Sequence, residues 1–285
     1  MMISPKQPGQ PCSFCGRIFG KNLSQCPRCK TKAGSSALDR GHTKLLSEAD
    51  EKPLARISTG PWDRCFGPAN GREKDGIVTT SVALIGGLRG GGKSTLSLQL
   101  CDSIAAKVGR EVLYICSEED IPEVKLRAQR LRIRCQHLIR GLTTTTGTES
   151  FGQLESILAQ YQPCAIILDS IPGLMGPDMA GAVDLCKLMK TYSVKLKAPS
   201  ILIDHVNKDG DFAGKEELQH TPDTCITLFP RPGQENVRVL TTEKNRFGQA
   251  FVSVALEMTE TGLVYLQEDE PEESPTHPAN PNEWE

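Results

Sequence analysis

Short apolar segments alternate with amphipathic segments through the middle of the chain. Six apolar runs have the length of buried β-strands, and they cover residues 80–85, 112–116, 165–169, 200–204, 224–229 and 237–242. Four longer stretches repeat apolar residues at helical spacing, and they cover residues 94–108, 122–132, 151–161 and 183–196. Since strands that alternate with helices form parallel sheets with helices on both faces, the pattern predicts an α/β domain built on a twisted, mostly parallel sheet. Functional side chains are then expected at the carboxyl ends of the strands.

A glycine-rich turn separates the first strand from the first helix. Residues 86–95 read Gly-Gly-Leu-Arg-Gly-Gly-Gly-Lys-Ser-Thr, which contains the phosphate-loop pattern G-x-x-x-x-G-K-S. Backbone N–H groups of such a loop surround nucleotide phosphates, the lysine reaches the β- and γ-phosphates, and the hydroxyl binds Mg²⁺. A flexible glycine linker is the alternative, but a strand before the turn and a helix after it disfavour that interpretation. The pattern predicts binding of ATP and Mg²⁺, with contacts from Gly87, Gly90, Gly91, Gly92, Lys93, Ser94 and Thr95.

Polar residues end three of the expected strands. Asp169 follows Ala-Ile-Ile-Leu and is expected to hold Mg²⁺ directly or through water. Glu118 and Glu119 follow the strand 112–116, and Glu118 is the first candidate to polarise the attacking water, with Glu119 the second. The alternative for Glu119 and Asp120 is a favourable interaction with the N-terminus of the next helix. His205 ends a third strand and is either a contact of the γ-phosphate or a structural histidine.

Two C-x-x-C pairs stand near the start of the chain. Ten residues separate Cys12 and Cys15 from Cys26 and Cys29. Four thiolates with this spacing are typical of a closed structural zinc site, which stabilises a small fold and does not catalyse. The alternatives are coincidental cysteines or a redox pair. The spacing predicts a zinc-binding knot over residues 1–34 whose folding depends largely on the metal.

Composition indicates an intracellular protein. The 285 residues carry a net charge of −2, with basic residues concentrated in 1–60 and acidic residues in 266–285. The start of the chain has no secretory apolar segment, and no apolar run approaches the length of a membrane span, so we expect a cytoplasmic protein. Seven of the eleven cysteines lie outside the knot, mostly among apolar neighbours. We expect Cys101, Cys116, Cys164 and Cys186 to be small core residues.

Further segments complete a recognisable combination with the cysteine pairs and the phosphate loop. Residues 205–214 read His-Val-Asn-Lys-Asp-Gly-Asp-Phe-Ala-Gly, and residues 218–224 read Leu-Gln-His-Thr-Pro-Asp-Thr. Residues 244–248 read Lys-Asn-Arg-Phe-Gly. These segments, in this order, resemble the RadA/Sms family of RecA-like ATPases, of which the pentapeptide is characteristic. The resemblance extends over roughly residues 10–265.

The resemblance implies a RecA-like fold and ATP-dependent work on DNA by a hexameric ring. It also implies that Lys244 and Arg246 reach the γ-phosphate of a neighbouring subunit. A positioned cation supplied in trans accelerates phosphoryl transfer by about 10³- to 10⁵-fold. The alternative is a pair of basic surface residues near a turn. Family members usually continue into a Lon-protease-like domain that contributes to ring assembly, and we do not expect this domain here.

The expected division is a zinc knot (1–34), a linker (35–56), an ATPase core (57–266) and a disordered acidic tail (267–285). The tail either docks on a partner protein or only aids solubility. By position, the segments 173–181 and 207–218 would line the pore of a ring, where Lys208 and Lys215 are the expected contacts of single-stranded DNA. A basic stripe on one helix is either a solvated face or a contact with DNA or another subunit, and it comprises Lys125, Arg127, Arg130, Arg132 and Arg134.

The sequence therefore favours a zinc-knotted, DNA-stimulated motor ATPase of helicase or branch-migration type, acting in recombination, repair or replication. The alternative is an ATP-switched DNA-binding scaffold or recombination mediator with slow hydrolysis. A small-molecule kinase with a phosphate loop is a third possibility, against which the segments 206–214 and 244–248 argue.

Overall fold

The computed structural model describes residues 10–11, 18–20, 23–28, 54–67, 75–144, 149–176, 179, 181–206 and 216–266. The chain divides into two compact units, Met1–Pro53 and Leu54–Glu285. The second unit starts three residues before the expected core boundary, and it includes β3 (Arg56–Ile57), which pairs antiparallel with β4 (Ile77–Val78).

In the first unit, β1 (Gln10–Pro11) pairs antiparallel with β2 (Ile18–Phe19). Cys26 is buried. The other three predicted zinc ligands, Cys12, Cys15 and Cys29, lie outside the described residues, as do Lys208, Lys215 and the acidic tail.

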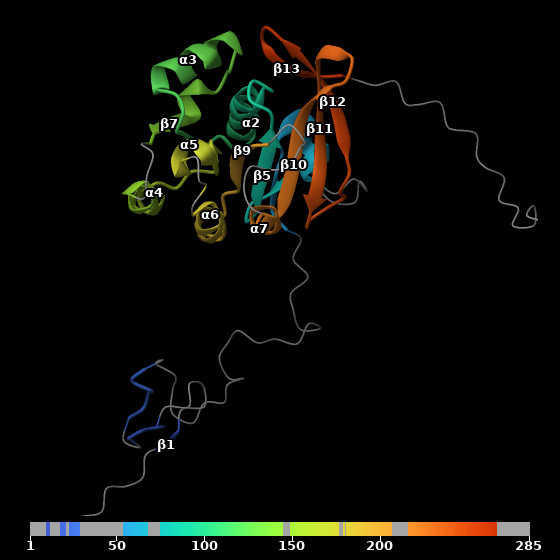
Figure 1. The fold of residues 1–285 in the computed structure, drawn as a ribbon. Helices are drawn as coiled ribbons and strands as arrows, with labels where there is room; N and C mark the ends of the chain where they lie inside the picture. The colour runs from blue at the N-terminus through green and yellow to red at the C-terminus, as the bar shows by residue number, and fades with distance from the viewer. Residues whose placement is uncertain are drawn as a thin grey trace, which may run out of the picture. The chain divides into compact units, whose positions relative to one another are not determined.

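Within the described residues, a nine-stranded sheet forms the centre of the second unit, in the order β13-β12-β11-β10-β5-β9-β8-β6-β7 (Figure 1). Six neighbouring strands are parallel, namely β10 (Thr224–Arg231), β5 (Val82–Gly87), β9 (Ser200–His205), β8 (Ala165–Asp169), β6 (Val112–Cys116) and β7 (Ile139–Thr143). Three antiparallel strands extend one side, namely β11 (Gln234–Asn245), β12 (Ser253–Thr259) and β13 (Gly262–Tyr265). The sheet is mostly parallel, as predicted from the sequence.

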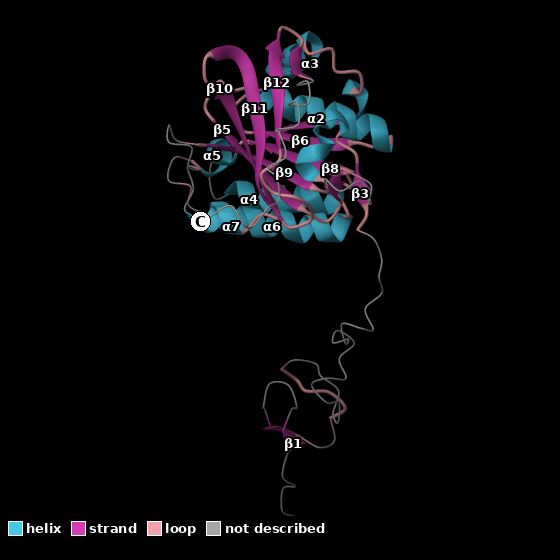
Figure 2. Ribbon diagram, turned by 90° about the vertical axis from the view of Figure 1, so that its right-hand side faces the viewer, coloured by secondary structure: helices cyan, strands magenta, loops and turns pink. Residues whose placement is uncertain are grey.

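Helices cover both faces of this sheet (Figure 2). One apolar cluster joins α1 (Asp63–Phe66), α2 (Lys93–Val108) and α3 (Ile121–Arg130) to one face. A second cluster joins the opposite face to α4 (Glu149–Gln160), α5 (Ile171–Met175), α6 (Ala182–Leu196) and α7 (Glu216–His220). Successive residues of β5 alternate between the two clusters because side chains of a strand point to opposite faces.

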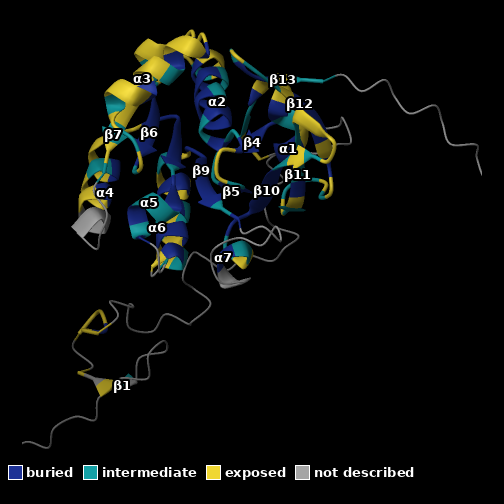
Figure 3. Ribbon diagram, turned by 45° about the horizontal axis from the view of Figure 1, so that its top comes forward, coloured by how far each residue is buried: buried dark blue, intermediate teal, exposed yellow. Residues whose placement is uncertain are grey.

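The central strands are buried on both faces, and this explains their continuous apolar sequences. Figure 3 shows β5 and β6 buried throughout, whereas α3 exposes much of its outer surface. The four cysteines expected in the core, Cys101, Cys116, Cys164 and Cys186, are all buried, which confirms that prediction. Among the described helices, none has both the length and the apolar character needed to cross a membrane.

Candidate nucleotide site and an opposing cation cluster

A cavity of about 480 Å³ lies at the carboxyl edge of the parallel strands. It brings together most of the residues predicted for nucleotide binding and catalysis, namely Gly90, Gly91, Gly92, Lys93, Ser94, Thr95, Glu118, Asp169 and His205. They come from the turn after β5, from the first turn of α2 and from the ends of β6, β8 and β9. Parallel topology therefore gathers side chains that are far apart in the chain, as expected for this class of sheet.

Two glycines of the turn are required by its geometry. Gly92 has a φ of +101°, and a Cβ at this position would lie 2.4 Å from Cε of Met258. A Cβ at Gly87 would lie 2.6 Å from the carbonyl oxygen of Leu228 on β10. The chain can turn sharply into α2 only because glycine tolerates both constraints. The N-terminus of α2 then faces the cavity, where backbone N–H groups and the helix dipole favour phosphate.

Lys93 is the buried cation of the site. Its Nζ donates to the carbonyl oxygens of Gly87 and Leu88, each at 2.8 Å. Burial lowers the pKa of Lys93, and the carboxylates of Asp169, Glu118 and Asp204 oppose this effect. Asp204 ends up fully buried beside β5, and burial raises its pKa to about 6. Asp204 was not among the site residues predicted from the sequence.

Asp169 and Ser94 provide the oxygen ligands that Mg²⁺ prefers. The Ser94 hydroxyl is hydrogen-bonded to the Asp169 carboxylate, and the Tyr114 hydroxyl donates to its Oδ2 at 2.7 Å. Burial raises the pKa of Asp169, whereas these two hydrogen bonds lower it. The pair thus fits a magnesium site between the phosphate loop and β8, where the metal would neutralise charge on the β- and γ-phosphate oxygens.

The two candidate acids after β6 have different partners. The Glu119 carboxylate forms an ion pair with Arg127 of α3. The Glu118 side chain is 47% exposed, and its Oε1 accepts a hydrogen bond from the Ser170 hydroxyl and lies 3.6 Å from Nε2 of His205. Asp120 instead forms a capping box with Glu123 at the start of α3, as its alternative interpretation anticipated. Both glutamates line the cavity, and Glu118 has the carboxylate less committed to a cation.

His205 faces Glu118 across the cavity in a defined tautomer. Arg89 Nε donates to His205 Nδ1 at 3.1 Å, so the proton of the neutral ring lies on Nε2. Burial and the nearby Lys93 lower the pKa of His205, and Glu118 opposes this effect. His205 can therefore donate a hydrogen bond from Nε2 into the cavity.

Two members of the basic stripe line the same cavity, a placement that neither interpretation of the stripe anticipated. Arg127 and Arg130 are three residues apart and share one face of α3. Nη1 of Arg127 is buried and has no hydrogen-bond partner within the described part of the chain. A buried guanidinium donor beside a phosphate loop is suited to an anionic ligand. Helical spacing in the sequence was the only available signal, and it does not reveal which face points inward.

Lys244 and Arg246 lie at the other end of the parallel strands, beside the amino ends of β10 and β5. Thr224, at the amino end of β10, pairs with Asn245 of β11 and with Ala83 of β5. β5 runs from Val82 to Gly87, and the phosphate loop follows its carboxyl end. At a rise of about 3.3 Å per residue, the two ends of β5 are about 17 Å apart. The two cations thus lie far from the phosphates that their own phosphate loop would bind.

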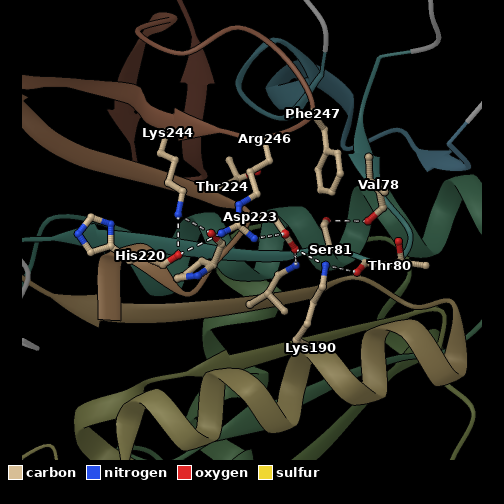
Figure 4. Close-up of polar contacts among 12 residues, drawn as sticks. Val78, Thr80, Ser81, Lys190, His220, Asp223, Thr224, Lys244, Arg246 and Phe247 are labelled. Carbon is tan, nitrogen blue, oxygen red and sulfur yellow. Dashed lines mark hydrogen bonds and ion pairs between the residues drawn. The ribbon is translucent and has the colours of Figure 1, made fainter. Parts of the chain in front are cut away.

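The backbone holds Lys244 closely and Arg246 loosely (Figure 4). Lys244 Nζ donates to the carbonyl oxygens of Gln219, His220 and Pro222, at 3.2, 2.8 and 2.8 Å. These three acceptors use all three donors of the ammonium group. Burial lowers the pKa of Lys244. The Arg246 side chain is 52% exposed and contacts Asp223 and the carbonyl oxygen of His220, each at 3.3 Å.

The rest of the pentapeptide shapes the turn that presents Arg246. The Asn245 Oδ1 accepts the Phe247 N–H at 3.0 Å and closes the turn. A Cβ at Gly248 would lie 2.3 Å from the carbonyl oxygen of Gly67, so only glycine allows this approach to the segment after α1. Arg56 donates to the Phe247 carbonyl oxygen at 2.7 Å from the other side.

Comparison with known proteins identifies similar sequences and folds. The family model "ATPase: KaiC" matches residues 63–270. DNA repair protein RadA of Chlamydia muridarum (strain MoPn / Nigg) is 32% identical over 274 residues, which cover 88% of this chain and 57% of that protein. DNA repair protein RadA of Bacillus subtilis (strain 168) is 29% identical over 283 residues, covering 88% and 58%. DNA repair protein RadA of Escherichia coli (strain K12) is 32% identical over 281 residues, covering 91% and 56%.

The chain thus spans a little over half the length of the curated relatives it matches. Among solved structures, a KaiC-like protein of the hyperthermophilic archaeon Pyrococcus horikoshii OT3 superposes with a TM-score of 0.60 at 15% identity. The superposition covers 75% of this chain and all of the archaeal chain. At this identity the similarity concerns the fold alone.

Proposed function

The chain belongs to the KaiC-type ATPase family, of the RecA superfamily, and we propose that it is an ATP-dependent DNA motor that hydrolyses ATP at the interfaces between its subunits. One observation carries the proposal. The cavity at the phosphate loop holds a lysine, two candidate magnesium ligands and a candidate base, whereas Lys244 and Arg246 lie by the amino end of β5, a strand about 17 Å long. These cations can meet a γ-phosphate only when it is bound by another copy of the chain.

Each residue then has a separate role. The phosphate loop holds ATP through Gly87, Gly90, Gly91, Gly92, Lys93, Ser94 and Thr95. Ser94 and Asp169 bind Mg²⁺, Glu118 polarises the attacking water, and His205 donates to the γ-phosphate. Lys244 and Arg246 of a second copy stabilise the charge that spreads over the transferred phosphoryl group. This division of labour makes hydrolysis depend on assembly.

The relatives named DNA repair protein RadA support a role in work on DNA. We infer a hexameric ring on single-stranded DNA, acting in recombination, repair or replication as a helicase or branch-migration enzyme. Lys208 and Lys215, which lie outside the described residues, would bind the phosphates without reading sequence.

Single-stranded DNA is expected to raise ATP turnover at least about 10-fold, with stimulation that weakens as salt rises because the contacts are made to phosphates. Replacing both Lys208 and Lys215 by alanine should remove most of the stimulation and leave basal turnover intact. Lys107→Ala, on the exposed last turn of α2, is the matched control. Phosphate release, measured with and without oligonucleotide across a salt series, reports both effects. Unstimulated turnover together with tight, nucleotide-dependent DNA binding would instead favour an ATP-switched scaffold with slow hydrolysis.

We also propose that Cys12, Cys15, Cys26 and Cys29 hold one structural zinc ion per chain. The expected metal content is about one zinc per chain, and Cys26→Ser should lower it to near zero because three thiolates leave the site open. Cys135→Ser is the control, since Cys135 is a free thiol in the ATPase core. Elemental analysis of the purified chain gives the ratio directly. A content below about half an ion per chain in the unmodified protein counts against the site.

A further inference from the structure

A buried carboxylate connects Arg246 to two other elements of the core (Figure 4). The Asp223 side chain is only 3% exposed. Its Oδ2 accepts the Val82 N–H at 2.9 Å and the Lys190 Nζ at 2.6 Å, and its Oδ1 lies 3.3 Å from Nη1 of Arg246. Asp223 therefore joins the start of β5, the helix α6 and the turn that carries Arg246.

The carboxylate itself is rigidly placed. The Asp223 N–H donates to the Val82 carbonyl oxygen at 2.9 Å, so main chain and side chain both attach this residue to β5. Arg246 in turn donates its main-chain N–H to the Asp223 carbonyl oxygen at 2.9 Å. Because the Arg246 side chain is half exposed, packing alone does not fix its direction, and the charged contact with Asp223 does.

Lys190 determines which oxygen of the Asp223 carboxylate is left for Arg246. Its Nζ donates to the Thr80 carbonyl oxygen at 2.9 Å as well as to Asp223 Oδ2, and it lies 5.9 Å from the centre of the Phe247 ring. With Oδ2 committed to Lys190 and Val82, Oδ1 is the oxygen that remains for Arg246. Removing either cation would leave this buried carboxylate poorly compensated.

Lys244 and Arg246 differ in how many of their N–H donors are already used within their own subunit. Lys244 uses all three of its N–H groups on carbonyl oxygens of its own subunit. Arg246 commits only two of its five N–H groups to contacts within the described residues, so a majority remains available to a phosphate. Arg246 therefore has more N–H donors left to bind a phosphate held by a second copy. Its contribution to ATP turnover then depends on the direction in which the guanidinium points.

We propose that Asp223 and Lys190 are positioning residues, which hold the Arg246 guanidinium in the direction in which it meets the nucleotide bound by a second copy of this chain. The proposal rests on the function proposed above, in which Arg246 acts in trans. A misplacement of about 1 Å at a reacting centre costs on the order of 100-fold in rate. Loss of the positioning contact should thus lower turnover without touching the nucleotide pocket.

The test compares Lys190→Met with Lys190→Arg in the full chain. Lys190→Met should lower the turnover number for ATP by about 10- to 100-fold and leave KM for ATP unchanged, because the phosphate loop is intact. Lys190→Arg keeps a cation beside Asp223 and should retain most of the activity. Lys187→Met, one turn earlier on α6, removes an exposed lysine paired with Asp184 and should behave as the unmodified chain. Asp223→Asn, which keeps the shape and removes the charge, should reproduce the loss seen with Lys190→Met.

Complementation separates positioning from general damage. A Glu118→Gln chain has a disabled site of its own but an intact Arg246, so mixing it with the Lys190→Met chain should restore turnover at interfaces where the latter supplies the pocket. A structural defect within the Lys190→Met pocket would not be restored by a partner. Unchanged turnover in both Lys190→Met and Asp223→Asn overturns the positioning role. If Arg246→Ala fails to be complemented in the same assay, the trans function itself is wrong.

Discussion

Replacing Glu118 by glutamine is expected to lower the turnover number for ATP by about 10²- to 10⁴-fold, the contribution typical of a positioned general base. Glutamine keeps the size of the side chain and its ability to accept from the Ser170 hydroxyl. It removes only the charge that would polarise water. Affinity for ATP should therefore be retained, because Lys93, Ser94 and Asp169 are unchanged.

Glu119→Gln is the matched comparison, one residue further along the same segment. Since Glu119 is paired with Arg127, its neutralisation should release a cation into the pocket and change turnover by less than about 10-fold. Steady-state phosphate release and binding of a fluorescent ATP analogue, measured on both variants, separate catalysis from affinity. A larger loss in Glu119→Gln than in Glu118→Gln would reverse the two roles.

Much of the nucleotide site could be predicted from local sequence because each part ends a buried strand. Asp169 and His205 follow continuous apolar runs, and the parallel topology implied by alternating helices places such ends together. The strands β6 and β8 were predicted with their observed bounds. Burial on both faces gives these strands an unambiguous apolar signal.

Strands at the sides of the sheet lack that signal. β7 lies at one edge, its sequence Ile-Arg-Gly-Leu-Thr is apolar at only two positions, and none of its residues is buried. At the other side, β12 and β13 pair as an antiparallel hairpin, where one apolar face is enough. These three strands were therefore not predicted from continuous apolar runs.

Contacts between segments far apart in the chain could not be predicted from the sequence. Lys190 and Asp223 are 33 residues apart and belong to a helix and to the start of a strand, so no periodicity relates them. In the sequence, Arg127 is one of several cations at helical spacing, which does not show which face of the helix points inward. The structure shows that Arg127 lines the cavity together with the phosphate loop. A polar residue directly before a buried strand, as Asp223 is, was the one available hint.

Replacing Arg246 by alanine is expected to lower ATP turnover by about 10³- to 10⁵-fold, the range for an arginine supplied in trans to a transferring phosphoryl group. The fold should persist, because the side chain is half exposed and Asp223 keeps its contacts with Lys190 and Val82. Arg110→Ala serves as the control, since Arg110 is exposed and makes one hydrogen bond to the Gln162 carbonyl oxygen. ATP affinity should not change, because the pocket of the same chain lies at the other end of β5, a strand about 17 Å long.

The decisive measurement mixes Arg246→Ala with Glu118→Gln, each inactive alone. If the cation acts across an interface, random assembly of equal amounts gives active interfaces wherever an Arg246→Ala chain supplies the pocket and a Glu118→Gln chain supplies the arginine. About a quarter of all interfaces then meet that condition, since a head-to-tail interface takes one face from each chain. If Arg246 acts within its own chain, no pairing of the two variants restores turnover. Activity that stays at the level of the separate variants, in a mixture shown to co-assemble, would therefore exclude action in trans.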